Sequence, residues 1–146
     1  MLWFMSHSHR TLDDVDGGGN TGRATIECPK CRTMMRRQRV GEIDVDRCQS
    51  CEGLWLDALE KEKLLRRPKD ARAADAGSAI PRHRPPSQII FCPRDTSRLI
   101  RLVDVDQPHV GFESCTVCGG VFLDAGELTD LSEVTLGEWV RRIVRV

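Results

Sequence analysis

The chain has 146 residues and no net charge, and only 5% of its residues are aromatic. Its 40% of hydrophobic and 30% of charged residues are typical of a soluble protein and exclude a fully disordered chain. With so few aromatic residues and no tyrosine, a large apolar core is excluded, so a small domain of this composition needs a covalent or metal cross-link.

No stretch approaches the roughly 18–20 apolar residues of a membrane span, so no membrane partner is expected. The opening run from Met1 to Met5 is too short for the core of a signal peptide, and no basic residue precedes it. We therefore expect a cytoplasmic protein, in which thiols stay reduced and paired cysteines bind metal more often than they form disulfides.

Residues 1–24 are polar and rich in glycine without an apolar period, which predicts a disordered arm. An internal repeat follows, with one copy in residues 25–67 and a second in residues 89–134. The first copy contains CPKC at 28–31 and CQSC at 48–51; the second contains CPRD at 92–95 and CTVC at 115–118. After the second cysteine pair, CEGLWLDALE aligns without a gap with CGGVFLDAGE. The two copies therefore indicate one small module used twice.

Short strands are predicted between the cysteine pairs, at residues 39–46 in the first copy and at residues 99–103 and 110–112 in the second. Each copy then begins a helix. Asp57 with Glu60, and Asp124 with Glu127, have the spacing of a capping box, in which a carboxylate caps the first turn. We therefore interpret the two aspartates as helix caps rather than catalytic groups.

Residues 68–88 contain Pro81, Pro85 and Pro86 and no strand pattern, which predicts a linker without a continuous helix. Residues 135–146 place apolar side chains on one side of a predicted helix and arginines largely on the other. This C-terminal amphipathic helix could either pack on the second module or present its apolar row to a partner.

The cysteine spacing Cys-x2-Cys-x16-Cys-x2-Cys predicts a zinc site, because two such turns brought together give the tetrahedral set of four sulfurs that Zn²⁺ prefers. Redox and disulfide interpretations are less favourable, because the larger fold around a redox pair is missing and seven cysteines cannot all pair. The predicted ligands of the first site are Cys28, Cys31, Cys48 and Cys51.

In the second copy, Asp95 stands where the eighth cysteine is missing, and a carboxylate oxygen is an acceptable zinc ligand. The predicted ligands of this site are Cys92, Asp95, Cys115 and Cys118. Two alternatives stay open for the fourth ligand. One is His109, which lies about 20 Å from Cys115 if the strand between them is extended; the other is water or no ligand. One or two zinc ions per chain are therefore expected. Trp55 and Phe122 are expected to cover the small core beside the metal.

The cysteine pairs, followed by GLWLDALE in the first copy and GVFLDAGE in the second, resemble the transcription-factor-IIB-type zinc ribbon of small bacterial proteins. The resemblance covers a little over half of the chain, and it implies a fold and a metal but no activity. We therefore expect a small metal-stabilised α+β protein. It should consist of two tandem zinc ribbons, each a pair of knuckles with short antiparallel strands and a following helix, joined by a linker.

No nucleophile is paired with a general base in this sequence, so an enzyme and a small-molecule substrate are not expected. The favoured function is a protein-interaction or regulatory module built on zinc. The alternative is nucleic-acid binding, for which the arginines between the first two cysteine pairs are the main support, at positions 32, 36, 37 and 39.

Overall fold

The computed structural model describes residues 22–75, 88–105, 107–108 and 110–133. The predicted C-terminal helix, most of the predicted arm, residues 76–87 and His109 lie outside the described residues. None of the helices within the described ranges is long and apolar enough to cross a membrane.

Each copy of the repeat folds into three antiparallel strands followed by helical residues. The first ribbon contains β1 (Met35–Val40), β2 (Ile43–Cys48), β3 (Leu54–Leu56) and α1 (Glu60–Leu65). The second contains β4 (Ile100–Val103), β5 (Gly111–Ser114), β6 (Val121–Leu123) and helical residues 127–133. This arrangement confirms the predicted α+β fold of tandem zinc ribbons.

The first two strands form a tight hairpin where the sequence predicted one strand over residues 39–46. β1 pairs with β2 from Met35 opposite Cys48 to Val40 opposite Ile43, and the chain turns at Gly41 and Glu42. Gly41 has a φ of 61°, a left-handed conformation that glycine adopts without the steric cost of a side chain. The glycine therefore divides the predicted strand in two.

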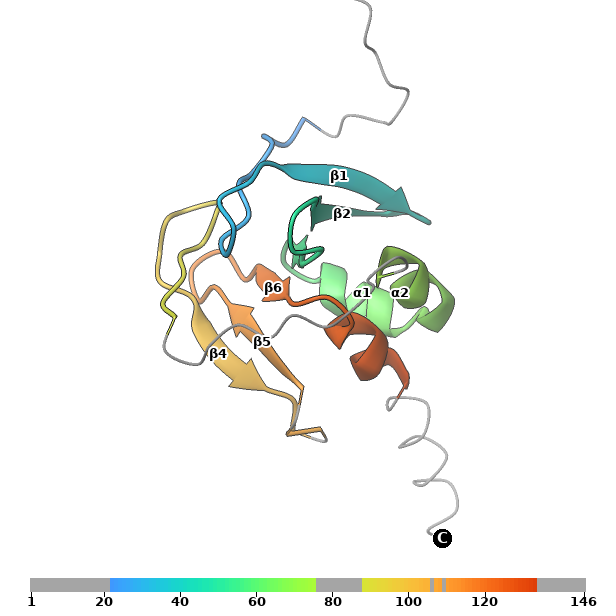
Figure 1. Ribbon diagram of the computed structural model, residues 1–146. Helices are drawn as coiled ribbons and strands as arrows, with labels where there is room; N and C mark the ends of the chain where they lie inside the picture. Colours follow the sequence, from blue (N-terminus) through green and yellow to red (C-terminus); the bar gives the residue numbers. More distant parts are fainter. Residues whose placement is uncertain (1–21, 76–87, 106, 109, 134–146) are drawn as a thin grey trace, which may run out of the picture.

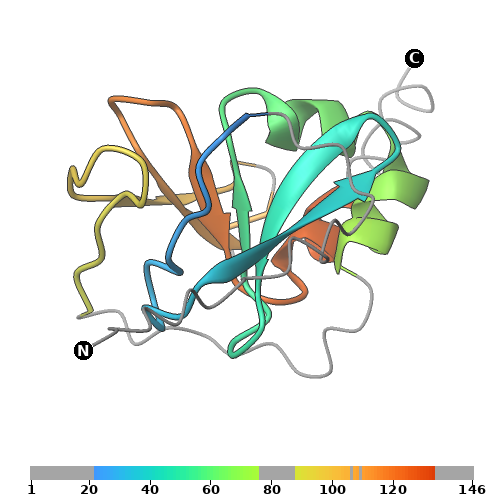
Figure 2. The same ribbon diagram turned by 90° about the horizontal axis from the view of Figure 1, so that it is seen from above.

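The two ribbons join edge to edge into one six-stranded sheet with the order β1-β2-β3-β6-β5-β4 (Figures 1 and 2). β3 and β6 pair antiparallel, with Trp55 opposite Phe122. These two residues occupy the same position in the repeat, so the pairing relates the ribbons by a local two-fold axis. The sequence predicted neither β3 nor β6 as a strand, because each has only three residues.

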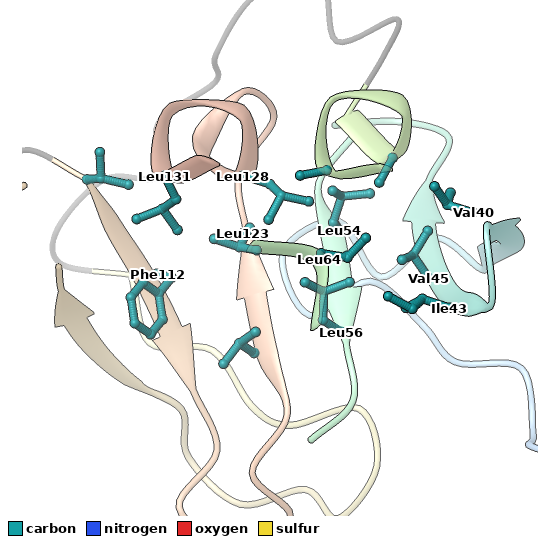
Figure 3. Packing of buried hydrophobic residues seen from close by; sticks show 14 residues of the cluster. Val40, Ile43, Val45, Leu54, Leu56, Leu64, Phe112, Leu123, Leu128 and Leu131 are labelled. Carbon is teal, nitrogen blue, oxygen red and sulfur yellow. The ribbon is translucent and has the colours of Figure 1, made fainter. Parts of the chain in front are cut away.

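One face of this sheet is covered by α1, α2 (Pro68–Asp75) and residues 127–133, and it holds the larger apolar cluster (Figure 3). Leu54 and Leu56 of β3 and Leu123 of β6 lie on this face, packed against Leu64 and Leu128 from the helices (Figure 3). The second cluster contains Trp55, Phe122 and cysteines of both predicted metal sites. Side chains alternate along a strand, so the helices and the metal sites lie on opposite faces of the sheet.

The first eight residues of the predicted linker instead form α2, so the linker prediction was wrong for this part. Pro68 begins the helix, a position at which proline costs no hydrogen bond. Ala71 and Ala74 are fully buried in the helix-side cluster. Asp75 accepts hydrogen bonds from the backbone N–H groups of Gly126 and Thr129, at 3.1 Å each, and therefore caps the helical residues of the second ribbon.

The predicted capping boxes form only in part. The Oε2 atoms of Glu60 and Glu127 accept hydrogen bonds from the backbone N–H groups of Asp57 and Asp124, both at 2.8 Å. However, Leu59 is the N-cap of α1 and provides no side-chain cap. The prediction that the Asp57 carboxylate caps this helix was wrong, because arginines and Trp55 bind it instead. Burial raises the pKa of Glu127 to about 8.

Two glycines at equivalent positions of the repeat each lie against the aromatic ring of the other ribbon. A Cβ atom on Gly53 would lie 2.4 Å from the Phe122 ring, and one on Gly120 would lie 2.3 Å from the Trp55 ring. The aromatic side chain of each ribbon therefore occupies the space beside the glycine of the other ribbon.

We expect the Gly120→Ala variant to be destabilised by roughly 1–3 kcal/mol, because the new methyl group overlaps the Trp55 ring in a close-packed interface. Urea unfolding at a fixed zinc concentration measures this difference, with Thr116→Ala at an exposed position of the same ribbon as the control. Equal unfolding midpoints for Gly120→Ala and the wild type would contradict the packing described.

Candidate metal centres

The first centre gathers four cysteines from two turns. Cys28 and Cys31 lie in the loop that precedes β1, Cys48 ends β2, and Cys51 precedes β3. Their four sulfur atoms all lie within 4.8 Å of one another, and three of the residues are fully or almost fully buried. The structure therefore brings together the four residues that the sequence predicted for the first site.

The second centre gathers Cys92, Asp95, Cys115 and Cys118, with ligand atoms also within 4.8 Å of one another. Asp95 takes the position of the missing cysteine, as the sequence predicted. Its carboxylate accepts hydrogen bonds from the backbone N–H of Ser97 at 2.9 Å and from the Ser97 hydroxyl. These bonds lower the pKa of Asp95 to about 2, so the side chain is an ionised carboxylate near neutral pH.

The spacing of the sulfurs fits a tetrahedral zinc ion. Zinc–sulfur bonds of about 2.3 Å in a tetrahedron place the sulfurs about 3.8 Å apart. The observed separations are 3.7 Å between Cys28 and Cys51 and 3.6 Å between Cys92 and Cys118. A disulfide would require about 2.05 Å. Four thiolates in the first site, and three thiolates with one carboxylate in the second, are both ligand sets that Zn²⁺ accepts, so the residues present fit the metal in both sites.

Backbone N–H groups point at the sulfurs in both centres. In the first, Cys31 donates to Cys28 at 3.4 Å, Ser50 donates to Cys48 at 3.3 Å, and Gly53 donates to Cys51 at 3.4 Å. In the second centre, Arg94 donates to Cys92, Cys118 donates to Cys115 and Gly120 donates to Cys118, each at 3.4 Å. Such bonds orient the ligands and favour the thiolate that zinc requires.

Hydrogen bonds and burial shift the pKa values of the thiols within each group. The Cys28 thiol is hydrogen-bonded to Cys51, which raises the pKa of Cys28 and lowers the pKa of Cys51 to about 5. Burial raises the pKa of Cys92 and of Cys118. Zinc binding therefore releases protons from these sites, and the binding free energy contributes to folding.

The basic residue inside the first turn of each ribbon reaches into the other ribbon. Lys30 Nζ lies 2.8 Å from Asp124 Oδ1, and both side chains are largely buried. Arg94 binds Asp57 through two hydrogen bonds of 3.0 and 3.1 Å. Lys30 and Arg94 are equivalent residues of the repeat, as are Asp57 and Asp124. These ion pairs between the ribbons were not predicted from the sequence, although the matched positions of the basic and acidic residues in the two copies were a signal of them.

The aromatic residues lie where the sequence predicted them, beside the metal ligands. Trp55 and Phe122 share one buried cluster with ligands of both centres, so a single apolar layer connects the two sites. Trp55 also donates a hydrogen bond from Nε1 to Asp57 at 3.0 Å. This contact joins the aromatic residue to the ion pair that Asp57 forms with Arg94.

Comparison with known proteins agrees with this geometry. The family model described as "Transcription factor zinc-finger", of the TFIIB-type zinc ribbon, matches residues 27–67 and again residues 91–134. The two segments together cover more than half of the chain and confirm the tandem copies. Searches of curated proteins and of solved structures found no significant match to the chain.

We expect Asp95→Cys to keep two zinc ions per chain and to slow zinc release from the second site by roughly tenfold or more, because a thiolate is the softer ligand. Cys31→Asp should make the first site resemble the second and release zinc faster. Release to a chromophoric chelator measures both changes. If Asp95→Cys releases zinc as the wild type does, Asp95 is not a ligand.

The ion pairs between the ribbons should couple the stability of the two metal centres. Asp124→Asn is expected to destabilise the chain by roughly 3 kcal/mol, because it breaks a largely buried ion pair by removing the charge of one partner. It should also speed zinc release from the first site, although Asp124 belongs to the second ribbon. Thermal unfolding and biphasic zinc release test this prediction.

The double variant Lys30→Met with Asp124→Leu replaces the pair by apolar groups and should recover most of the lost stability. If Asp124→Asn changes only the second site, or if the double variant is no better than the single one, the pair does not couple the ribbons.

Proposed function

Since the chain belongs to the TFIIB-type zinc-ribbon family, we propose that it is a non-catalytic interaction module that binds a partner protein along β4. Its zinc ions hold a six-stranded sheet in one shape, and the end of that sheet presents the binding surface. The observation that carries the proposal is the difference between the two end strands of the sheet.

Within the described residues, β4 pairs only with β5, so its outer edge is open. Three of its four residues are exposed apolar side chains: Ile100 at 42%, Leu102 at 41% and Val103 at 55%. The fourth, Arg101, is neutralised by Glu113 at 2.8 Å. An open edge with exposed apolar side chains favours the addition of another strand.

β1, at the opposite end, is protected against such pairing. It carries Arg36, Arg37 and Arg39, and charged side chains on an edge strand discourage the approach of another strand. The partner at β4 is therefore expected to be an extended protein segment with apolar residues at alternate positions, which would meet Ile100 and Leu102. Backbone hydrogen bonds would give affinity, and the alternate side chains would give specificity.

A non-catalytic role is supported by the ligand sets. Both centres have four protein side chains for one tetrahedral metal, whereas catalytic zinc sites keep one position for water or substrate. Four ligands favour a structural role for the zinc.

We expect the Ile100→Lys/Leu102→Lys variant to lose at least about tenfold of its partner binding, because two charges then line the edge that the partner strand approaches. Affinity capture from nuclease-treated extract, with quantification of each protein, measures the loss. The matched control is Val117→Lys, a charge at a 71% exposed apolar position of the same ribbon.

Zinc content of each variant verifies that the fold is intact. The proposal fails if every protein captured by the wild type is retained by the β4 variant, or if nuclease treatment removes all of them from the wild type.

A further inference from the structure

Asp95 differs from the other seven residues of the two metal centres in the number of atoms that it can offer to a metal. A cysteine binds zinc through its only sulfur, whereas a carboxylate has two oxygens, and either of them can be the ligand. A tetrahedral ion that already has three thiolates in the second centre has one position left for oxygen. The surroundings of Asp95 therefore decide which oxygen faces the metal and how firmly it is held there.

The two carboxylate oxygens of Asp95 have different neighbours. Oδ1 accepts hydrogen bonds from the backbone N–H of Ser97 at 2.9 Å and from the Ser97 hydroxyl. Oδ2 instead lies 3.2 Å from Cys115 Sγ. A tetrahedral zinc ion with bonds of about 2.0 Å to oxygen and about 2.3 Å to sulfur places these two ligand atoms about 3.5 Å apart. Oδ1 is thus turned toward Ser97, and Oδ2 is the oxygen in position for the metal.

Ser97 also differs from its counterpart in the first ribbon, Thr33. The backbone carbonyl of Ser97 accepts a hydrogen bond from the Cys92 N–H at 2.7 Å. The carbonyl of Thr33 accepts the same bond from the Cys28 N–H at 2.8 Å, which shows that the two positions are equivalent. Thr33 is exposed, whereas Ser97 is half-buried and its Oγ lies 3.1 Å from Cys115 Sγ. The hydroxyl therefore lies at the centre in the ribbon in which a carboxylate replaces a cysteine.

We propose that Ser97 is a positioning residue of the second centre and holds Asp95 as a metal ligand through Oδ2 alone. Its N–H and its hydroxyl both occupy Oδ1, so the carboxylate is kept from turning that oxygen toward the metal. Hydrogen bonds that orient a ligand from behind in this way typically change metal affinity by roughly 10–100-fold when they are removed. The inference concerns the metal centre and does not depend on partner binding at β4.

The Ser97→Ala variant tests the proposal, because it removes the hydroxyl and keeps the backbone N–H that closes the turn. Zinc release from the second centre of the full chain to a chromophoric chelator should become roughly tenfold faster. Ser97→Thr restores a hydroxyl and should release zinc within about threefold of the wild type. Unchanged release in Ser97→Ala would overturn the proposal, as would release from Ser97→Thr that is as fast as from Ser97→Ala.

The matched control is Thr96→Ala, which removes a hydroxyl from the neighbouring, exposed residue. The Thr96 hydroxyl donates to the backbone carbonyl of Asp95 at 2.6 Å and not to its carboxylate. This variant should release zinc within about twofold of the wild type, because the ligand oxygens keep their partners. Equal acceleration by Thr96→Ala and Ser97→Ala would overturn the proposal, since both variants would then act on the loop as a whole.

Two further measurements separate positioning of the ligand from a general effect on stability. In an Asp95→Cys background, Ser97→Ala should cause no further change in zinc release, because a thiolate has no second oxygen to restrain. The absorption spectrum of bound Co²⁺ reports its ligands, and the spectra of Ser97→Ala and the wild type should differ, with the unchanged first centre cancelling in the difference. Equal acceleration by Ser97→Ala in both backgrounds, or identical Co²⁺ spectra, would overturn the proposal.

Discussion

The structure depends on the antiparallel pairing of β3 with β6, which places Trp55 directly opposite Phe122. From this central pair, one row of side chains crosses every strand of the sheet in order. The row is Arg37, Asp46, Trp55, Phe122, Glu113 and Arg101. Two aromatic residues occupy its centre, a buried acid flanks each of them, and an arginine neutralises each acid at the ends. A three-stranded ribbon alone would leave its aromatic residue at an open edge.

This pairing explains why glycine, aromatic residue and aspartate occur at fixed spacing in both copies. In each ribbon, the glycine leaves space for the aromatic ring of the other ribbon, and the aspartate binds the basic residue between the first two metal ligands of the other ribbon. The repeated motif is thus a self-complementary interface rather than only a helix start. Ligands of both metal centres belong to one buried cluster, so zinc, sheet and core stabilise each other. Zinc can supply a large share of the folding free energy that so small an apolar core lacks.

The sequence sufficed for the features that depend on local spacing. Cysteine spacing placed seven of the eight ligands, and the alignment of the copies placed Asp95. Three-residue strands such as β3 carry too little periodicity to be recognised, and their pairing joins residues 67 positions apart, as for Trp55 and Phe122. The role of Asp57 was misjudged for a related reason: its spacing to Glu60 is that of a cap, but Arg94 reaches it only after the ribbons join. α2 was missed because prolines later in the segment outweighed the helix-forming residues that follow Pro68.

Duplication leaves the centre and the ends of this sheet under different constraints. At the centre, each residue of one ribbon must fit its counterpart in the other, so glycine, aromatic residue and aspartate are kept in both. At the two ends of the sheet, β1 and β4 lie far from each other in the strand order, and their side chains are free to differ. The side chains of the two end strands do differ in chemistry, since β1 carries three arginines and β4 carries Ile100, Leu102 and Val103. A rigid two-fold core with unlike ends presents two chemically different edge strands at a fixed separation, which a single ribbon could not do.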